Sequence, residues 1–202
     1  MHRLSCIEIA KIVWISLWAA IATLIVFLPV TVSALLSRTV NLAFTLYKIR
    51  AYIMLKATRV RPVIRGREKI KPGQSYIIIS NHQSEYDILA IVTTLGIQYR
   101  WIIKKELRKA PMFGYALYAS RNIFIDRGDP EQAMQSIRKG LDRLPDGVSV
   151  MFFAEGTRSA DGSIAPFKKG GFLMALEKGL PILPVTVNGS RRVLPKKSLI
   201  FN

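Results

Sequence analysis

A short apolar run passes directly into polar residues in Tyr76-Ile77-Ile78-Ile79-Ser80-Asn81-His82-Gln83-Ser84-Glu85-Tyr86-Asp87. The apolar part predicts a buried strand, and His82 follows its end with an aspartate five positions on. Open α/β sheets bind their ligands at such strand ends. A neutral imidazole held by a carboxylate is a general base near pH 7. The stretch therefore predicts an α/β fold with a reactive site beside this strand.

From about residue 60 onward, short β-type runs alternate with helical stretches. The expected strands are Val60 to Ile64, Tyr76 to Ser80, Tyr99 to Ile103, Ile123 to Asp126, Val148 to Ala154 and Ile182 to Val187. The expected helices are Glu85 to Leu95, Pro111 to Ala119, Pro130 to Leu144 and Gly171 to Lys178. This alternation predicts a layered α/β domain with a largely parallel or mixed sheet.

A second polar motif, Phe153-Ala154-Glu155-Gly156-Thr157-Arg158-Ser159, follows another β-type run. An arginine in a loop after a strand can grip a phosphate with two parallel hydrogen bonds. A base and a phosphate anchor together indicate proton removal from a hydroxyl of a phosphorylated substrate. The alternative is a polar turn in which Arg158 is merely solvated.

The histidine motif also has a purely structural interpretation. Ser84-x-x-Asp87 resembles a capping box at the start of a helix, which would give Asp87 a role without chemistry. Lys104-Lys105-Glu106 can likewise be a solvated charge run. The residues alone leave these alternatives open.

The charge of the chain points to an anionic partner. There are 30 Lys and Arg against 13 Asp and Glu, a formal net charge of +17. Phosphate, nucleic acid or an acidic membrane would all suit such a surplus. Cys6 is the only cysteine, so no intrachain disulfide can form. With only His2 and His82 as histidines, we expect no metal site and no bound cofactor.

The N-terminal segment indicates a membrane. Residues 12–37 carry no charge over 26 positions, and a bilayer span takes about 20 apolar residues. A cleaved signal peptide, processed at Val32-Ser33-Ala34, is disfavoured because the apolar stretch is too long and runs past that site. Pro29 lies inside the stretch, so a full span and a helix bent back within one leaflet both stay open.

Residues 39–57 predict a second helix, apolar with basic residues spaced along it. That composition suits the headgroup boundary of an anionic membrane, although a helix packed on the globular domain is the alternative. Positive charge is denser after the apolar segment than before it, which predicts a body facing the cytosol. We expect membrane helices over residues 1–58 and the α/β domain over 59–202.

Four short sequence blocks, taken in their order along the chain, resemble those of a known protein family. They are Asn81-His82 to Asp87, then Phe124-Ile125-Asp126-Arg127, then Phe153 to Ser159, then Leu180-Pro181-Ile182-Leu183-Pro184-Val185. Together, over roughly Val60 to Gly189, they resemble the 1-acylglycerol-3-phosphate acyltransferase family. Arg121 is a departure, since the family commonly has glycine there. Family members also continue past Asn202 with further strand and helix, so a truncated form is one expectation.

The resemblance implies transfer of a fatty acyl group from coenzyme A or acyl carrier protein to the sn-2 hydroxyl of lysophosphatidic acid, giving phosphatidic acid. By the same matching, His82 is the base and Asp87 its orienting partner. The residues implied for the acceptor phosphate site are Glu155, Gly156, Thr157, Arg158, Lys105 and Arg127. Relatives with similar histidine and aspartate pairs acylate glycerol 3-phosphate or other lysophospholipids, so these acceptors remain the alternative.

Two other classes compete with an acyltransferase. A serine hydrolase is disfavoured because Gly147-Val148-Ser149-Val150-Met151 lacks the second glycine of a nucleophile elbow. A non-enzymatic binding protein could use the basic cluster at Arg59, Arg61, Arg65, Arg67, Lys69 and Lys71. No nucleic-acid motif or aromatic stacking pattern accompanies that cluster, so we expect anionic membrane lipids rather than nucleic acid as its partner.

Overall fold

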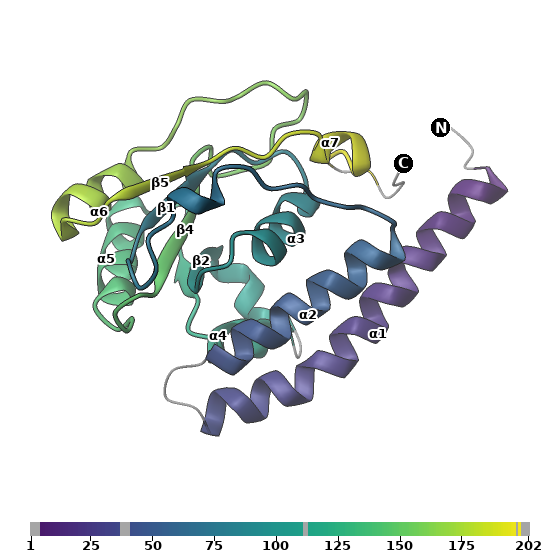
Figure 1. The fold of residues 1–202 in the computed structure, drawn as a ribbon, viewed down its shortest axis with the longest axis horizontal. Coiled ribbons are helices and arrows are strands. Elements are labelled where there is room, and N and C mark those ends of the chain that lie inside the picture. Colours follow the sequence, from purple (N-terminus) through teal and green to yellow (C-terminus); the bar gives the residue numbers. More distant parts are fainter. Residues whose placement is uncertain (1–4, 37–40, 111–112, 197, 199–202) are drawn as a thin grey trace.

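The computed structural model describes residues 5–36, 41–110, 113–196 and 198. Within these residues the sheet has five parallel strands in the order β3-β2-β4-β1-β5 (Figure 1). The strands are β1 (Ile77–Ser80), β2 (Tyr99–Lys104), β3 (Ile123–Ile125), β4 (Ser149–Phe153) and β5 (Ile182–Val185). The predicted fold class is confirmed, and the sheet is parallel throughout this region.

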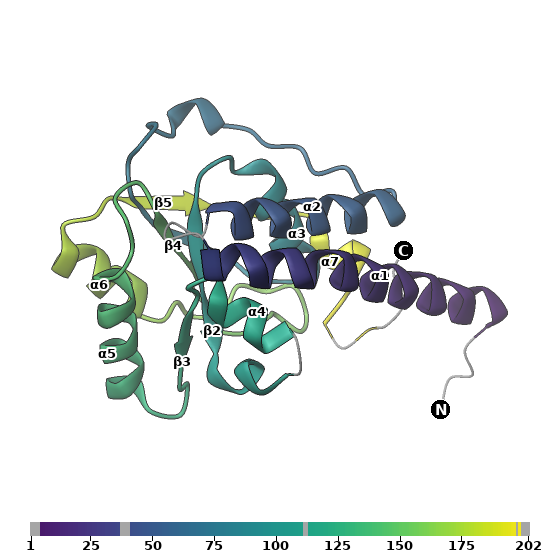
Figure 2. The same ribbon diagram turned by 90° about the horizontal axis from the view of Figure 1, so that it is seen from below.

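Helices cover both faces of the sheet. One face carries α2 (Asn41–Ala57) and α3 (Glu85–Thr94), and the other carries α5 (Pro130–Leu141) and α6 (Gly170–Lys178) (Figures 1 and 2). Because side chains alternate along a strand, Ile78 packs toward α3 while Ile77 and Ile79 pack toward α5 and α6. This two-sided burial explains why β1 reads as a continuous apolar run.

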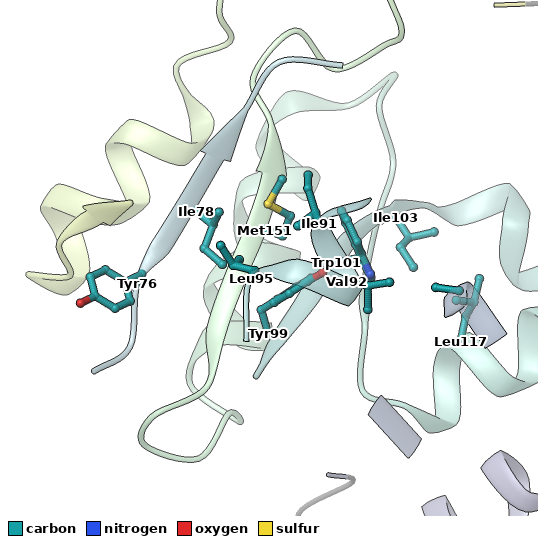
Figure 3. Packing of buried hydrophobic residues seen from close by; sticks show 11 residues of the cluster. Tyr76, Ile78, Ile91, Val92, Leu95, Tyr99, Trp101, Ile103, Leu117 and Met151 are labelled. Carbon is teal, nitrogen blue, oxygen red and sulfur yellow. The ribbon is translucent and has the colours of Figure 1, made fainter. Parts of the chain in front are cut away.

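The core on the α3 face is rich in aromatic and branched side chains (Figure 3). Tyr99 and Trp101 of β2 lie 5.2 Å apart in an edge-to-face arrangement, a favoured geometry for aromatic pairs. Ile78 is fully buried beside Met151. Burial of such a side chain contributes roughly 1.5–3 kcal/mol to the free energy of folding. This packing holds the strands, and therefore their ends, in place.

The N-terminal helices lie side by side along the domain. The long helix α1 (Cys6–Leu36) runs beside α2 and also contacts α4 (Phe113–Ala119) (Figures 1 and 2). Val26 and Val30 of α1 are buried together with Ala43 of α2 and Ala116 of α4. The second helix is therefore packed on the globular domain, as one of its two interpretations predicted.

Most of α1 nevertheless presents apolar side chains outward. In its segment Cys6–Val30 the most apolar 18-residue window has a mean hydropathy of 2.3, and only 11% of that window is buried. Leu24 is 63% exposed and Leu28 is 64% exposed. By length and composition this helix can cross a bilayer, and it continues through Pro29 rather than ending there.

The predicted strand Val60 to Ile64 is wrong. This segment has no regular secondary structure and pairs with no strand in the described structure, and Val63 is 84% exposed. Pro62 has no N–H to donate to a ladder, which weakens any pairing here. The other five predicted strands are confirmed to within two residues at each end. The start of the predicted helix at Pro111, and residues 37, 39 and 40 of the predicted N-terminal segments, lie outside the described residues.

Three further short elements complete the described chain. These are the 3₁₀ turns Arg67–Lys69 and Lys105–Lys109 and the helix α7 (Ser190–Val193). Arg121, which stands where glycine is common in the resembling family, has a φ of 57°. A side chain in this left-handed region costs roughly 1–2 kcal/mol, so the backbone turn before β3 is kept without the residue that suits it best.

Candidate active site

Both polar motifs begin where a parallel strand ends, on the same edge of the sheet. His82 follows β1, and Arg158 follows β4. The two strands are hydrogen-bonded neighbours, with Ser80 in register with Phe153. The sheet order thus brings together two loops that are far apart in the sequence, and the crevice outside the carboxyl ends of the strands is where such sheets bind ligands.

His82 is held by Asp87. The imidazole Nδ1 lies 2.8 Å from the carboxylate Oδ2 of Asp87, whose side chain is fully buried. An ionised carboxylate can only accept a hydrogen bond, so Nδ1 carries the proton and donates it. In the neutral imidazole the other ring nitrogen, Nε2, carries no proton and can accept one from a substrate.

Asp87 performs the capping role at the same time. Its Oδ2 atom also accepts hydrogen bonds from the main-chain N–H groups of Gln83 (2.6 Å) and Ser84 (2.9 Å), and Ser84 caps the first turn of α3. Burial alone raises the pKa of the Asp87 carboxyl. The hydrogen bonds that it accepts, from His82 and then from the main chain, outweigh burial and hold its pKa below the ordinary value.

The face of the imidazole is fixed as well. His82 stacks on Phe153 with ring centroids 3.6 Å apart and an angle of 8° between the planes. Phe153 in turn stacks on Trp101 at 5.5 Å. Asp87 sets the rotation of the ring in its plane and Phe153 sets the plane itself, so the imidazole is held in one orientation.

Glu155 lies beneath the site rather than in it. Its side chain is buried, and its two carboxylate oxygens accept from the main-chain N–H groups of His82 (2.9 Å) and Ala165 (3.0 Å). The main-chain carbonyl of His82 accepts from Ser159 N–H at 2.8 Å. These bonds tie the histidine loop to the arginine loop, a role that no pattern in the sequence indicates.

Arg158 is partly exposed and paired with a carboxylate. Its Nη1 atom lies 2.9 Å from Oε1 of Glu85, whose side chain is 53% exposed. Lys196 donates to the main-chain carbonyl of Arg158, and its Nζ lies 3.5 Å from Oγ1 of Thr157. An ion pair this exposed is weak, so an incoming phosphate can compete with Glu85 for the guanidinium.

One large cleft joins these groups. It has a volume of about 810 Å³, within the range of small-molecule sites, and His82 lines it. Among the residues expected from the sequence, Gly156, Thr157, Arg158 and Arg127 line it too. Lys105 does not line it in the described structure; its ammonium pairs with Asp126, which does.

The cleft also contains side chains that the sequence did not single out. Lys168 and Lys169, just before α6, add two cations. The apolar lining includes Tyr47, Ile88, Trp101, Ile103, Leu107, Phe113 and Leu117. The two lysines lie outside the four sequence blocks. Their place in the cleft is evident only from the structure, in which the chain returns to the end of β4. In the described ranges, no group of three His, Cys, Asp or Glu side chains is arranged to hold a metal ion.

Comparisons with known proteins give a consistent result. Residues 61–188 match the acyltransferase family. The chain is 35% identical over 136 residues to the chloroplastic 1-acyl-sn-glycerol-3-phosphate acyltransferase BAT2 of Brassica napus, covering 67% of this chain and 39% of that protein. It is 36% identical over 145 residues to the human 1-acyl-sn-glycerol-3-phosphate acyltransferase alpha, covering 70% of this chain and 50% of that protein. The chain therefore spans about half the length of these relatives, or less.

A solved structure agrees with the sequence relatives. The crystal structure of the 1-acyl-sn-glycerophosphate acyltransferase PlsC from Thermotoga maritima superposes with a TM-score of 0.61 and 27% sequence identity. The superposition covers 91% of this chain and 81% of that one, so it includes the N-terminal helices as well as the sheet. Because the family match spans every strand of the described sheet and both loops of the cleft, the chain belongs to the acyltransferase family.

Proposed function

We propose that this chain transfers a fatty acyl group from a thioester to the sn-2 hydroxyl of 1-acylglycerol 3-phosphate, giving phosphatidic acid. The observation that carries the proposal is the presence of His82, oriented by Asp87, and Arg158 in the lining of one cleft. The names of the relatives support the acceptor. The donor is acyl-coenzyme A or acyl-acyl carrier protein.

His82 acts as the general base. Its Nε2 takes the proton of the acceptor hydroxyl while the hydroxyl oxygen attacks the thioester carbonyl carbon. The tetrahedral intermediate then collapses, the carbon–sulfur bond breaks, and the imidazolium returns its proton to the leaving thiolate. Asp87 stays ionised and stabilises the imidazolium, and such a base contributes roughly 10²–10⁴ in rate.

Arg158 holds the acceptor by its phosphate. A planar guanidinium matches two phosphate oxygens at once, and binding the phosphate there positions the hydroxyl for His82. Gly156, Thr157 and Arg127 belong to the same lining. Glu155 enters the proposal as a positioning residue, because a carboxylate repels phosphate and both of its oxygens are engaged by main-chain N–H groups.

The membrane supplies the acceptor. Tyr47 of α2 and Phe113 and Leu117 of α4 line the cleft, and both helices pack against α1. We propose that α1 holds the protein at the bilayer, with the catalytic domain on the cytosolic side and basic residues after α1 near anionic lipid. Apolar lining next to this anchor is suited to the acyl chains of a lipid acceptor.

An acceptor and donor panel tests the function. Membranes bearing the wild-type protein are given lysophosphatidic acid, glycerol 3-phosphate, lysophosphatidylcholine or monoacylglycerol, each with acyl-coenzyme A or acyl-acyl carrier protein, and products are measured by mass spectrometry. We expect phosphatidic acid from lysophosphatidic acid as the main product. Arg158→Ala should raise the KM for this acceptor by roughly 10- to 100-fold, with a smaller effect on kcat. Preferred use of monoacylglycerol would refute the phosphate site.

A further inference from the structure

Lys168 lies beside the arginine loop although it is ten residues further along the chain. After β4 the chain leaves at Ala154 and returns at Lys168, whose main-chain N–H donates to the carbonyl of Ala154 at 2.8 Å. Glu155 fastens the same loop through Ala165. The start of α6 is thereby held against the end of β4, and Lys168 lines the cleft.

The side chain of Lys168 lies across Gly156. A Cβ atom built on Gly156 would be 2.8 Å from Cε of Lys168 and 3.1 Å from its Nζ. Gly156 has a φ of +71°, which side chains rarely adopt, so the glycine serves both the turn and the close approach. The Lys168 ammonium consequently lies over Gly156 in the loop that follows β4, and Gly156 is two residues before Arg158 in the sequence.

No ion pair in the described part of the chain neutralises the charge of Lys168. Arg158 pairs with Glu85, and Lys105 pairs with Asp126. Among the residues that the structure describes, no carboxylate lies within 4.0 Å of the Lys168 ammonium. A cation held over a reactive loop without a counter-ion is arranged to receive an anion from solution.

We propose that Lys168 is a phosphate-binding residue of the cleft, and that Gly156 leaves the space in which the Lys168 side chain lies. The proposal rests on the proposed function, in which both substrates are phosphorylated. Lysophosphatidic acid and acyl-coenzyme A present the same chemistry to an ammonium. The phosphate of either substrate can therefore be the partner of Lys168, and kinetics distinguishes them.

The test compares Lys168→Met, which keeps a long apolar side chain over Gly156 but removes the charge, with Lys168→Arg, which keeps the charge. The KM for each substrate is measured at saturating concentration of the other. We expect Lys168→Met to raise one KM by roughly 10- to 100-fold, as for loss of a hydrogen bond to a charged group. Lys168→Arg should restore most of the affinity. A rise for lysophosphatidic acid identifies the acceptor phosphate, and a rise for acyl-coenzyme A identifies the donor phosphates.

The control is Lys139→Met, which removes an exposed lysine on α5 outside the lining of the cleft. It changes the net charge equally, and we expect unchanged KM values. Equal KM values for wild type and Lys168→Met would overturn the inference.

Direct binding separates this inference from the proposed function. Binding of lysophosphatidic acid and of acyl-coenzyme A to the detergent-solubilised full chain is measured by calorimetry. If the wild type forms no phosphatidic acid, the proposed function fails. If Lys168→Met binds either ligand more weakly than wild type does, the lysine site is still upheld. If the variant binds both ligands as tightly as wild type does, the lysine site is refuted.

Discussion

At the scale of single residues, Asp87 joins local structure to chemistry. One carboxylate oxygen accepts from the main chain at the start of α3 and from the imidazole of His82. The start of the helix therefore orients the carboxylate, and the carboxylate orients the imidazole of His82. The capping and orienting interpretations of Asp87 were alternatives in the sequence, and the structure contains both contacts.

The depressed pKa of Asp87 predicts how stability depends on pH. Since the folded state favours the carboxylate, its stabilisation is complete above the ordinary value of 3.8 and is lost as the pH falls through the lower folded value. Asp87→Asn places an amide against two N–H donors and should lower the free energy of unfolding by about 3 kcal/mol at pH 7. In urea unfolding measured from pH 7 to pH 3, the difference in the free energy of unfolding between variant and wild type should become smaller as the pH falls.

Asp142→Asn is the matched control, because Asp142 is 57% exposed and pairs only with Lys178 among the described side chains. Its effect should stay within about 0.5 kcal/mol at every pH. A deficit of Asp87→Asn that is constant across this pH range would contradict the account.

Sequence reasoning found the residues of the two motifs but not all their neighbours. A five-residue offset is local, so the contact between His82 and Asp87 could be predicted. The place of Lys168 depends on a loop closing onto Ala154, and the engagement of Glu155 depends on a main-chain N–H ten residues away. Such contacts between turns of irregular backbone leave no periodic pattern in the sequence.

At the scale of elements, a short C-terminal segment ties both active-site loops. The Ser84 hydroxyl donates to the carbonyl of Leu194 at 2.7 Å, and Lys196 donates to the carbonyl of Arg158. This segment follows the region matched by the family, which ends at residue 188. It contacts the start of α3 and the arginine loop together, so we expect the spacing between His82 and Arg158 to depend on it.

Ser84→Ala tests this contact. The substitution removes the cap of α3 and leaves the Leu194 carbonyl without its donor, and we expect a loss of about 1–2 kcal/mol in the free energy of unfolding. Because the same turn carries Asp87, kcat should also fall several-fold at temperatures where the variant is fully folded. Asp129→Ala, which removes the exposed cap of α5, should lose similar stability and keep its kcat. Equal kcat values for both variants would show that the cap does not position His82.

The elements themselves were largely predictable. Asp129 followed by Pro130 is a common start of a helix and begins α5, and the left-handed Gly179 is a common end and terminates α6. The segment Val60 to Ile64 has strand composition but no partner strand among the described residues, because pairing is a property of the sheet rather than of the segment.

At the scale of the whole molecule, the sheet order creates the site. The chain passes from β1 to β2 and β3 and then inserts β4 between β2 and β1. This insertion brings the loop after β4 beside the loop after β1. The alternation of strands and helices predicts a parallel sheet, but not which strand returns to the middle, since that depends on packing between distant segments.

The exposed apolar surface of α1 offers a test of the proposed membrane anchor. If α1 is the anchor, Leu24→Asp places a charge in the hydrocarbon, at a cost of roughly 2.5–3.5 kcal/mol near the bilayer centre. We expect a clear shift of the protein from pellet to supernatant in liposome sedimentation. Leu176→Asp changes a leucine of α6 that is 81% exposed, and should leave the partition unchanged. Equal partition of the two variants would argue against anchoring by α1.

The rate of phosphatidic acid formation by His82→Ala tests the central claim most directly. The full chain in liposomes is given lysophosphatidic acid and an acyl thioester at saturating concentrations, and the variant is compared with wild type at pH 7. Loss of the base predicts a fall in kcat of roughly 10²–10⁴, with the fold intact by circular dichroism. A His82→Ala protein that turns over within a few-fold of wild type would contradict the account.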